Sequence, residues 1–301
     1  MSYVQHQCPN CGAAVPAPSR GTVRCEYCAT ELTPGVHGWA PTAPADTFTP
    51  LRDPHLPRLW LEQHRYALLG RLGRGEHSDV FLARRDARIT ELVVVKLLRP
   101  GGDPAALARE AHILREMESC RLQGAAHFTR LLPQPVAQGT ARLGMHGNEG
   151  TQVASALRWR SGFVHTFGDV ATAYPGGIPA PATVWLWKRI LEQLGFVHRA
   201  GVGHGALTAD HLLVHARDHG VVLIGWTRAG PLTAEQQAAD IRHSARCVRA
   251  LAGTQPLPER LEQLLAQPPV DAWAAREQLD ATAGAVFGPP KYIPLPMPGW
   301  R

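Results

Sequence analysis

Four cysteines near the start of the chain have the spacing of a metal site. Cys8 and Cys11 belong to a CPNC motif, Cys25 and Cys28 belong to a CEYC motif, and thirteen residues separate the two pairs. Four thiolates can surround Zn²⁺ at about 2.3 Å in the tetrahedral arrangement that this ion prefers. A segment of about 30 residues buries little apolar surface, so we expect the metal to supply the free energy that folds it.

The segment 1–33 resembles zinc ribbons, which bind nucleic acid or protein. Two disulfides would need an oxidising compartment, and the N-terminal sequence MSYVQHQCPN does not have the pattern of a signal peptide. A dithiol redox site would need only one CxxC motif. The charged side chains of the segment cancel, whereas a surface that binds phosphates would be basic. We therefore expect a structural zinc ion and contact with a protein rather than with nucleic acid.

A second group of residues follows the proline-rich linker that we predict for 34–59. A glycine turn, with Gly73 and Gly75, lies between two apolar stretches, and the β-rich sequence ELVVVKLL places Lys96 near the end of a strand. The next segment has Asp103 as a candidate helix N-cap and proline at the first helical position. Its apolar spacing indicates a helix that carries Glu110 about two turns from its start.

Downstream, the apolar spacing of residues 183–201 indicates a long amphipathic helix that ends at a glycine. The sequence HGALTADHLLVHARDHGVVLIGW follows directly and indicates a loop, a short hairpin and a turn. Together with the glycine turn, the lysine strand and the glutamate helix, this order of elements resembles that of protein kinases over about residues 60–290.

The resemblance implies an α+β fold: a two-lobed protein-kinase-like domain preceded by the zinc ribbon. Its small β-rich lobe, with one helix, would span about residues 60–155, and its mainly α-helical large lobe about residues 156–290. In protein kinases a glycine loop covers the ATP phosphates, a strand lysine contacts them and a helix glutamate holds the lysine. The residues at these positions are, in this sequence, Gly73, Gly75, Ser78 in place of a third glycine, Lys96 and Glu110, with Glu116 as an alternative glutamate.

Three positions depart from the protein-kinase pattern. Ala206 stands where that pattern has the catalytic aspartate, and His211 stands where it has the asparagine that binds Mg²⁺. Gly225 replaces the aspartate that binds the second metal ion. Mg²⁺ prefers oxygen ligands, which neither an imidazole nor a glycine side chain provides. Asp210 and Asp218 lie nearby in the sequence, but neither stands at the position of the base.

The segment after this turn is short. Only about eleven residues precede Ala239-Asp240-Ile241, where we expect the next long helix to begin. The resemblance implies that Asp240 supports the loop around His204 by hydrogen bonding. It also implies that the platform on which kinases bind a peptide substrate is missing.

We therefore expect a pseudokinase, which is a kinase-like protein without efficient catalysis, acting as a protein-binding scaffold or regulator. Weak ATP binding without Mg²⁺ and a purely structural Lys96–Glu110 pair both stay open. An active atypical Ser/Thr kinase or small-molecule phosphotransferase is one alternative, and a nucleic-acid-associated adaptor is another. The net charge of +6 is spread along the 301 residues, and no apolar stretch approaches 18 residues. We expect a cytoplasmic protein without a membrane segment.

Two further features bear on a protein partner. Seven tryptophans lie outside the ribbon's core, and we expect most of them to be buried and some to anchor a partner. The tail 291–301, with the sequence KYIPLPMPGWR after two prolines, is rich in proline and aromatic residues. The sequence leaves open whether this tail packs on the domain or binds a partner.

Overall fold

The computed structural model describes most of the chain after residue 56 and short stretches before it. The described ranges are 6–7, 14–15, 22–24, 31–35, 38–41, 57–87, 91–144 and 146–297. The described strands of the N-terminal part are β1 (His6–Gln7), β2 (Ala14–Val15), β3 (Val23–Arg24), β4 (Glu31–Gly35) and β5 (Gly38–Pro41). Cys8, Cys11, Cys25 and Cys28 lie outside the described residues, so the zinc ribbon stays a prediction.

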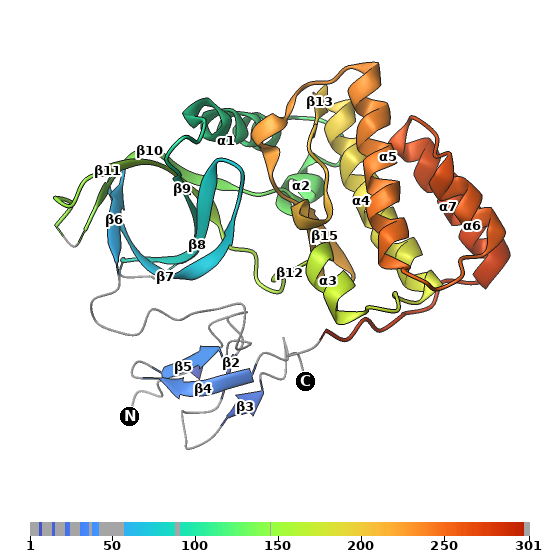
Figure 1. Cartoon of the computed structure of the whole chain (residues 1–301), viewed down its shortest axis with the longest axis horizontal. Coiled ribbons are helices and arrows are strands. Elements are labelled where there is room, and N and C mark those ends of the chain that lie inside the picture. The colour runs from blue at the N-terminus through green and yellow to red at the C-terminus, as the bar shows by residue number, and fades with distance from the viewer. Residues whose placement is uncertain are drawn as a thin grey trace.

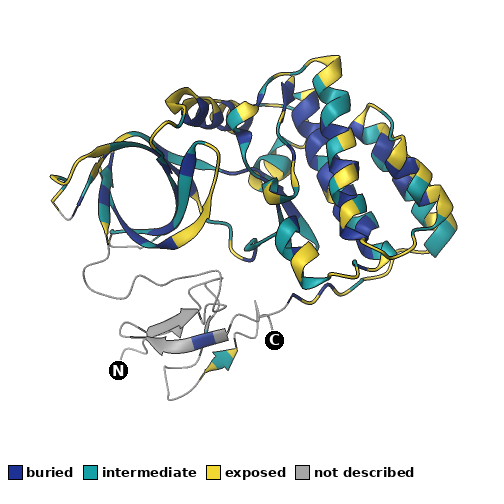
Figure 2. Ribbon diagram, in the orientation of Figure 1, coloured by how far each residue is buried: buried dark blue, intermediate teal, exposed yellow. Residues whose placement is uncertain are grey.

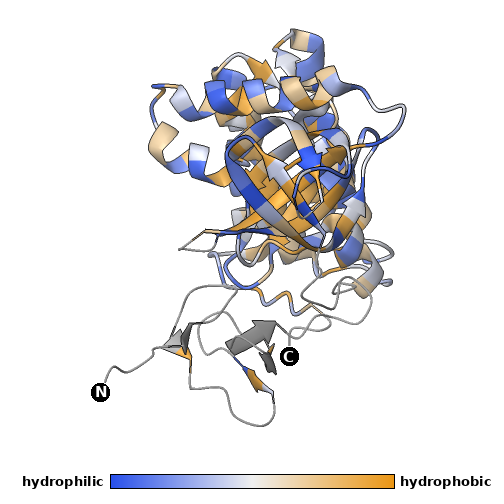
Figure 3. Cartoon of the chain, turned by 90° about the vertical axis from the view of Figure 1, so that its left-hand side faces the viewer, coloured by the Kyte–Doolittle hydropathy of each residue, from blue (hydrophilic) through white to orange (hydrophobic). Residues whose placement is uncertain are grey.

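Six antiparallel strands form a closed barrel in the order β10-β11-β9-β8-β7-β6 (Figure 1). Every second residue of β9 points inward, so Val93, Val95 and Leu97 join the barrel's apolar core. The hydropathy colouring shows the apolar residues of the barrel wall (Figure 3). The strands are β6 (Arg58–Leu61), β7 (His64–Arg74), β8 (Ser78–Arg85), β9 (Glu91–Leu98), β10 (Pro135–Leu143) and β11 (Thr151–Arg158).

Strand β6 closes the barrel, and it begins within the range that we predicted as a linker. It pairs with β7, and its residues Leu59 and Trp60 pair with Leu143 and Arg142 of β10. The short sequence RLWL alternates buried and half-buried residues, which is the pattern of a strand with one face in a core. The prolines before it hid this signal in the sequence.

Helix α1 (Pro104–Ser119) lies between the barrel and the helical part of the molecule (Figure 1). Asp103 caps it, because the Asp103 side chain accepts a hydrogen bond from the backbone N–H of Ala105 at 2.8 Å. Its residues Ile113, Leu114 and Met117 belong to the core of the helical part rather than to that of the barrel. Helix α1 therefore shares the core of the helical part, while it also contacts strands β10 and β11 of the barrel.

The helical part is built around helix α4, which is buried along much of one side (Figure 2). This helix begins three residues earlier than predicted, at Ala180, because proline fits the first turn of a helix, where no N–H partner is needed. The helices of this part are α2 (Ala125–Phe128), α3 (Phe167–Ala173), α4 (Ala180–Arg199), α5 (Ala234–Leu251), α6 (Glu259–Ala266) and α7 (Ala272–Phe287). Short strands accompany them: β12 (His165–Thr166), β13 (Val202–Gly203), β14 (Leu212–His215), β15 (Gly220–Leu223) and β16 (Gly230–Pro231).

Helix α5 also begins earlier than expected, at Ala234 instead of at about residue 239. Thr233 is its N-cap, since the Thr233 hydroxyl accepts a hydrogen bond from the backbone N–H of Gln236 at 3.1 Å. The segment between the turn at Gly225 and this helix is therefore even shorter than the sequence indicated.

Residues 291–297 of the tail pack on the helical part and run back along it (Figure 1). Leu295 and Met297 are buried in its core. The His219 ring lies between the rings of Trp185 and Tyr292, with parallel stacking and centroid distances of 4.1 Å and 4.4 Å. The described part of the tail thus completes the core of the helical part. Among the described residues, no helix is long and apolar enough to span a bilayer.

We predict that Leu295→Ala lowers the free energy of unfolding by about 2–4 kcal/mol, because it removes a side chain that is only 3% exposed. Urea denaturation followed by circular dichroism measures the change. Val270→Ala is the control, since Val270 is 63% exposed and its truncation should change little. Equal, small effects of both substitutions would show that the tail does not contribute to the core in solution.

Candidate functional site

Lys96 and Glu110 form a buried ion pair between strand β9 and helix α1. The Lys96 Nζ lies 2.7 Å and 2.6 Å from the two carboxylate oxygens of Glu110. The Glu110 side chain is fully buried, and its Oε1 also accepts a hydrogen bond from the backbone N–H of Trp226 at 3.0 Å. One carboxylate therefore binds three segments: the lysine strand, the helix and the turn that follows Gly225.

The glycine turn between β7 and β8 is held at several points. The Arg99 guanidinium donates to the carbonyl of Gly75 at 2.9 Å, and the backbone N–H of Asp103 lies 3.3 Å from His77 Nδ1. Across the gap between the two parts, Arg228 Nη2 lies 2.9 Å from both carboxylate oxygens of Glu76. Both side chains of this last pair are 59% exposed, so we expect it to contribute at most about 1 kcal/mol.

Asp240 organises the loop that contains Ala206. Its carboxylate accepts hydrogen bonds from the backbone N–H of His204 at 2.8 Å and of Gly205 at 3.0 Å, and its Oδ2 lies 3.2 Å from His198 Nε2. Burial alone would raise the pKa of Asp240, but these bonds outweigh it and lower that pKa. The expectation that Asp240 supports this loop by hydrogen bonding is confirmed.

His204 is a buried neutral histidine at the start of this loop. Its Nε2 donates to the carbonyl of Ile224 at 3.0 Å, and its ring lies 4.5 Å from that of Trp226. Burial lowers the pKa of His204 to about 4, against the opposing effect of the Asp240 carboxylate. The imidazole is therefore uncharged near neutral pH.

Ala206, His211 and Gly225 lie close together. His211 Nδ1 is hydrogen-bonded to the carbonyl of Ala206, and the backbone N–H of Ile224 donates to the carbonyl of His211 at 2.9 Å. Gly225 has a left-handed backbone with φ of +79°, and a Cβ built on it would lie 2.5 Å from Cδ2 of the His211 ring. The imidazole therefore occupies the space into which a side chain at position 225 would extend.

Two other carboxylates near this place point elsewhere. Asp210 packs against Gly168 at the start of α3, where a Cβ would lie 2.8 Å from Asp210 Oδ1. Asp218 is bound to its neighbour Arg217, with 2.8 Å between Oδ1 and Nε, on the turn between β14 and β15. Both carboxylates are thus engaged away from Ala206.

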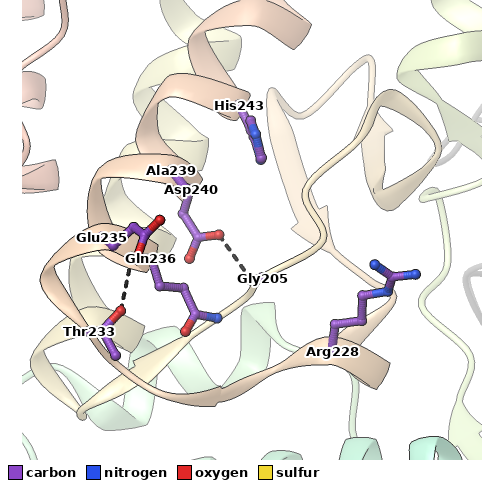
Figure 4. A pocket seen from close by; sticks show the side chains of 8 residues that line it. All are labelled: Gly205, Arg228, Thr233, Glu235, Gln236, Ala239, Asp240 and His243. Carbon is purple, nitrogen blue, oxygen red and sulfur yellow. Dashed lines mark hydrogen bonds between the residues drawn. The ribbon is translucent and has the colours of Figure 1, made fainter.

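A cavity of about 350 Å³ lies beside the loop, between Arg228 and the start of α5 (Figure 4). Asp240 and Gly205 form part of its wall, and the dashed line between them marks one of the bonds described above. Gly205 has φ of +72°, and a Cβ there would lie 2.7 Å from the carbonyl of Arg228. The position that carries arginine in the protein-kinase pattern therefore has no room for a side chain. The lining residues are Gly205, Arg228, Thr233, Glu235, Gln236, Ala239, Asp240 and His243.

The structure thus brings the sequence-predicted residues into one region, with Gly73, Gly75 and Ser78 in the hairpin above Lys96 and Glu110. Sequence reasoning missed the contact of Arg228 with Glu76. These residues are 152 positions apart, and no local pattern connects them. Trp226 is fully buried, in agreement with the expectation that most of the tryptophans are buried, so it does not anchor a partner.

Comparison with solved structures shows that the chain has a protein-kinase-like fold. The BubR1 kinase domain is similar with a TM-score of 0.56 and 11% sequence identity, over 76% of this chain and 83% of that one. Vaccinia related kinase 3 is similar with a TM-score of 0.56 and 14% identity, over 84% of this chain and 97% of that one. No family model matches the sequence, and no curated protein is similar to it in sequence. The mixed barrel and helical content fits the two-lobed domain that the sequence predicted.

We predict that Gly225→Ala destabilises the protein by about 1–3 kcal/mol, because the methyl group would meet the His211 ring and because φ is positive. In a His211→Ala background the same change should cost less, since the ring is gone. A double-mutant cycle by urea denaturation measures the difference, which we expect to be at least about 0.5 kcal/mol. Additive effects would mean that the ring does not lie against Gly225.

The buried His204 predicts a loss of stability in mild acid. The unfolded chain binds a proton at His204 below about pH 6.5, whereas the folded chain resists protonation until about pH 4. The stabilisation is therefore fully present above pH 6.5 and falls as the pH drops to 4, by up to about 3 kcal/mol. Other histidines whose pKa burial lowers add to the slope in the same direction: His165, His215, His219 and His243.

The variant His204→Gln should flatten this pH dependence by about one proton, because glutamine does not titrate. Urea denaturation at several pH values between 4 and 7.5 measures the slope. Val270→Ala, which removes no titratable group from an exposed position, is the control and should leave the slope unchanged. A wild-type slope in the His204 variant would contradict the assignment.

Proposed function

We propose that this chain is a catalytically impaired protein-kinase-like protein that works through protein contacts, as a scaffold or as a regulator of a partner. The observation that supports this most directly is the His211 ring beside Gly225. Phosphoryl transfer in protein kinases depends on carboxylate and amide oxygens that hold Mg²⁺ and on an aspartate that accepts the substrate proton. At the corresponding positions this chain has an imidazole, a glycine and the methyl group of Ala206.

The remaining contacts support a role for the folded shape itself. Glu110 connects Lys96 with the backbone of Trp226, and Asp240 fixes the loop at His204. These bonds assemble the two parts of the domain although the groups that would do chemistry are absent. A domain of this kind can present a defined surface to a partner without turning over a substrate.

Nucleotide binding, in this proposal, is weak and independent of Mg²⁺. A Cβ would meet nothing within 4 Å at Gly73 and only an ordinary contact at Gly75, so the fold does not require either glycine. Glycine has no Cβ, so Gly73 and Gly75 would allow a ligand to lie close to the loop backbone. Against tight binding, positions 206, 211 and 225 carry no oxygen-bearing side chain that would hold Mg²⁺ beside the phosphates, and Glu76 brings a negative charge to the loop. The proposed zinc site at Cys8, Cys11, Cys25 and Cys28 rests on cysteine spacing alone.

The experiment combines a phosphotransfer assay with a thermal-shift titration. Wild-type protein and Lys96→Ala should show the same background with radiolabelled ATP, with Mg²⁺ and with Mn²⁺, on themselves and on generic protein substrates. A ligand that binds the folded state raises the melting temperature. Because the proposal has no Mg²⁺ ligand at the site, any rise with ATP should be the same with and without Mg²⁺. Turnover that disappears in Lys96→Ala would instead make the chain an active atypical phosphotransferase.

A further inference from the structure

A second cavity, of about 310 Å³, lies between α2, α4 and α7, away from the site described above. Three aromatic rings form much of its wall. The ring of Phe128 stacks on that of Phe196 at a centroid distance of 5.0 Å and meets that of Trp273 edge-on at 6.0 Å. Gln123, Gly124 and Arg199 complete the lining.

The backbone of α4 places Trp273 at this cavity. Gly195 lies inside the helix, and a Cβ there would come within 2.6 Å of the indole Cε2. A glycine inside a helix costs about 1 kcal/mol relative to alanine. Because Gly195 has no side chain, the Trp273 ring can lie directly against the backbone of α4. Phe196 is 2% exposed and belongs to the large core, so the floor of the cavity is fixed.

One charged residue, Arg199, lines the cavity. Arg199 stands at the last turn of α4 and is exposed, and it has no ion pair or hydrogen bond with any residue that the structure describes. Exposed Arg121 and Arg130 flank the segment that carries Phe128. The exposed acids on α7 near Trp273 in the sequence are Asp271, at the N-cap, and Glu277, one turn after Trp273. Among the lining residues, however, the charged side chain is that of Arg199, so the apolar opening itself carries a positive charge.

We propose that this cavity anchors a partner polypeptide that presents a bulky apolar side chain next to acidic residues. The apolar side chain would enter between the rings of Phe128 and Trp273, and a neighbouring carboxylate would pair with Arg199. The volume lies at the small end of ligand sites, roughly 300–1,000 Å³, and suits one side chain with its flanking backbone. Buried aromatic anchors of this kind contribute most of the free energy in many interfaces. The inference rests on the proposed protein-binding function and names the surface for it.

The probe is a phage-displayed library of random peptides, selected on the full chain, from which enriched peptides are resynthesised with a fluorescent label. We expect an apolar residue beside Asp or Glu in these peptides. Fluorescence anisotropy should show that Trp273→Ala weakens binding by about tenfold or more. Arg199→Gln should weaken it by about threefold to fivefold and reduce its salt dependence. Arg260→Gln, an exposed arginine on α6, is the matched control and should bind as wild type does.

Circular dichroism and the melting temperature show whether Trp273→Ala is folded. Arg199 is exposed, so Arg199→Gln tests the rim even if the tryptophan variant fails to fold. If the enriched peptides bind all variants equally, the cavity is not their binding site. The same conclusion follows if the selection enriches no peptide with an apolar residue beside Asp or Glu. Either result would leave a protein-binding function intact. If the wild-type chain forms a dimer and Trp273→Ala abolishes it, the cavity binds a second copy of the chain. The proposal of a separate partner polypeptide would then be wrong. The phosphotransfer assay tests the proposed function separately.

Discussion

The fully buried carboxylate of Glu110 is the interaction on which the arrangement of the two parts depends. A buried charge is tolerated only when it is paired and hydrogen-bonded, and Glu110 has both kinds of partner, in Lys96 and the backbone of Trp226. These partners come from the barrel and from the turn after Gly225. If either moved away, the carboxylate would lose a bond in a place that water does not reach. The position of α1 between the two cores therefore depends on all three segments.

Near Glu110, the residues that hold the fold together differ from those at the positions where protein kinases carry their catalytic groups. Lys96, Glu110 and Asp240 all carry bonds that hold the fold together, and each of these residues is present. Ala206, His211 and Gly225 carry no such bond to a carboxylate, and the imidazole fills the space next to the glycine. The bonds that assemble this kinase-like fold thus use carboxylates other than those that the protein-kinase pattern has at positions 206 and 225. The fold and the function of such a domain therefore depend on different residues.

Much of this could be predicted from the sequence because the signals are local. The cap at Asp103, the lysine strand and the helix of Glu110 follow from short-range patterns, and their order indicated the fold. The start of α5 was placed too late, because Thr233 with Gln236 makes a cap of a type that is common in loops as well. Contacts between distant segments, such as Glu76 with Arg228, leave no trace in the periodicity of either segment.

The closed barrel restricts how a partner can bind the small part of the domain. An open sheet leaves unpaired N–H and C=O groups at its edge, to which another chain can add a strand. Here the short strand β6 pairs with β7 on one side and with β10 on the other, so the barrel as described has no free edge. Recognition of the barrel must therefore use side chains on its outer surface. Such contacts depend on the residue types that are exposed, and they select partners by chemistry rather than by a shared backbone pattern.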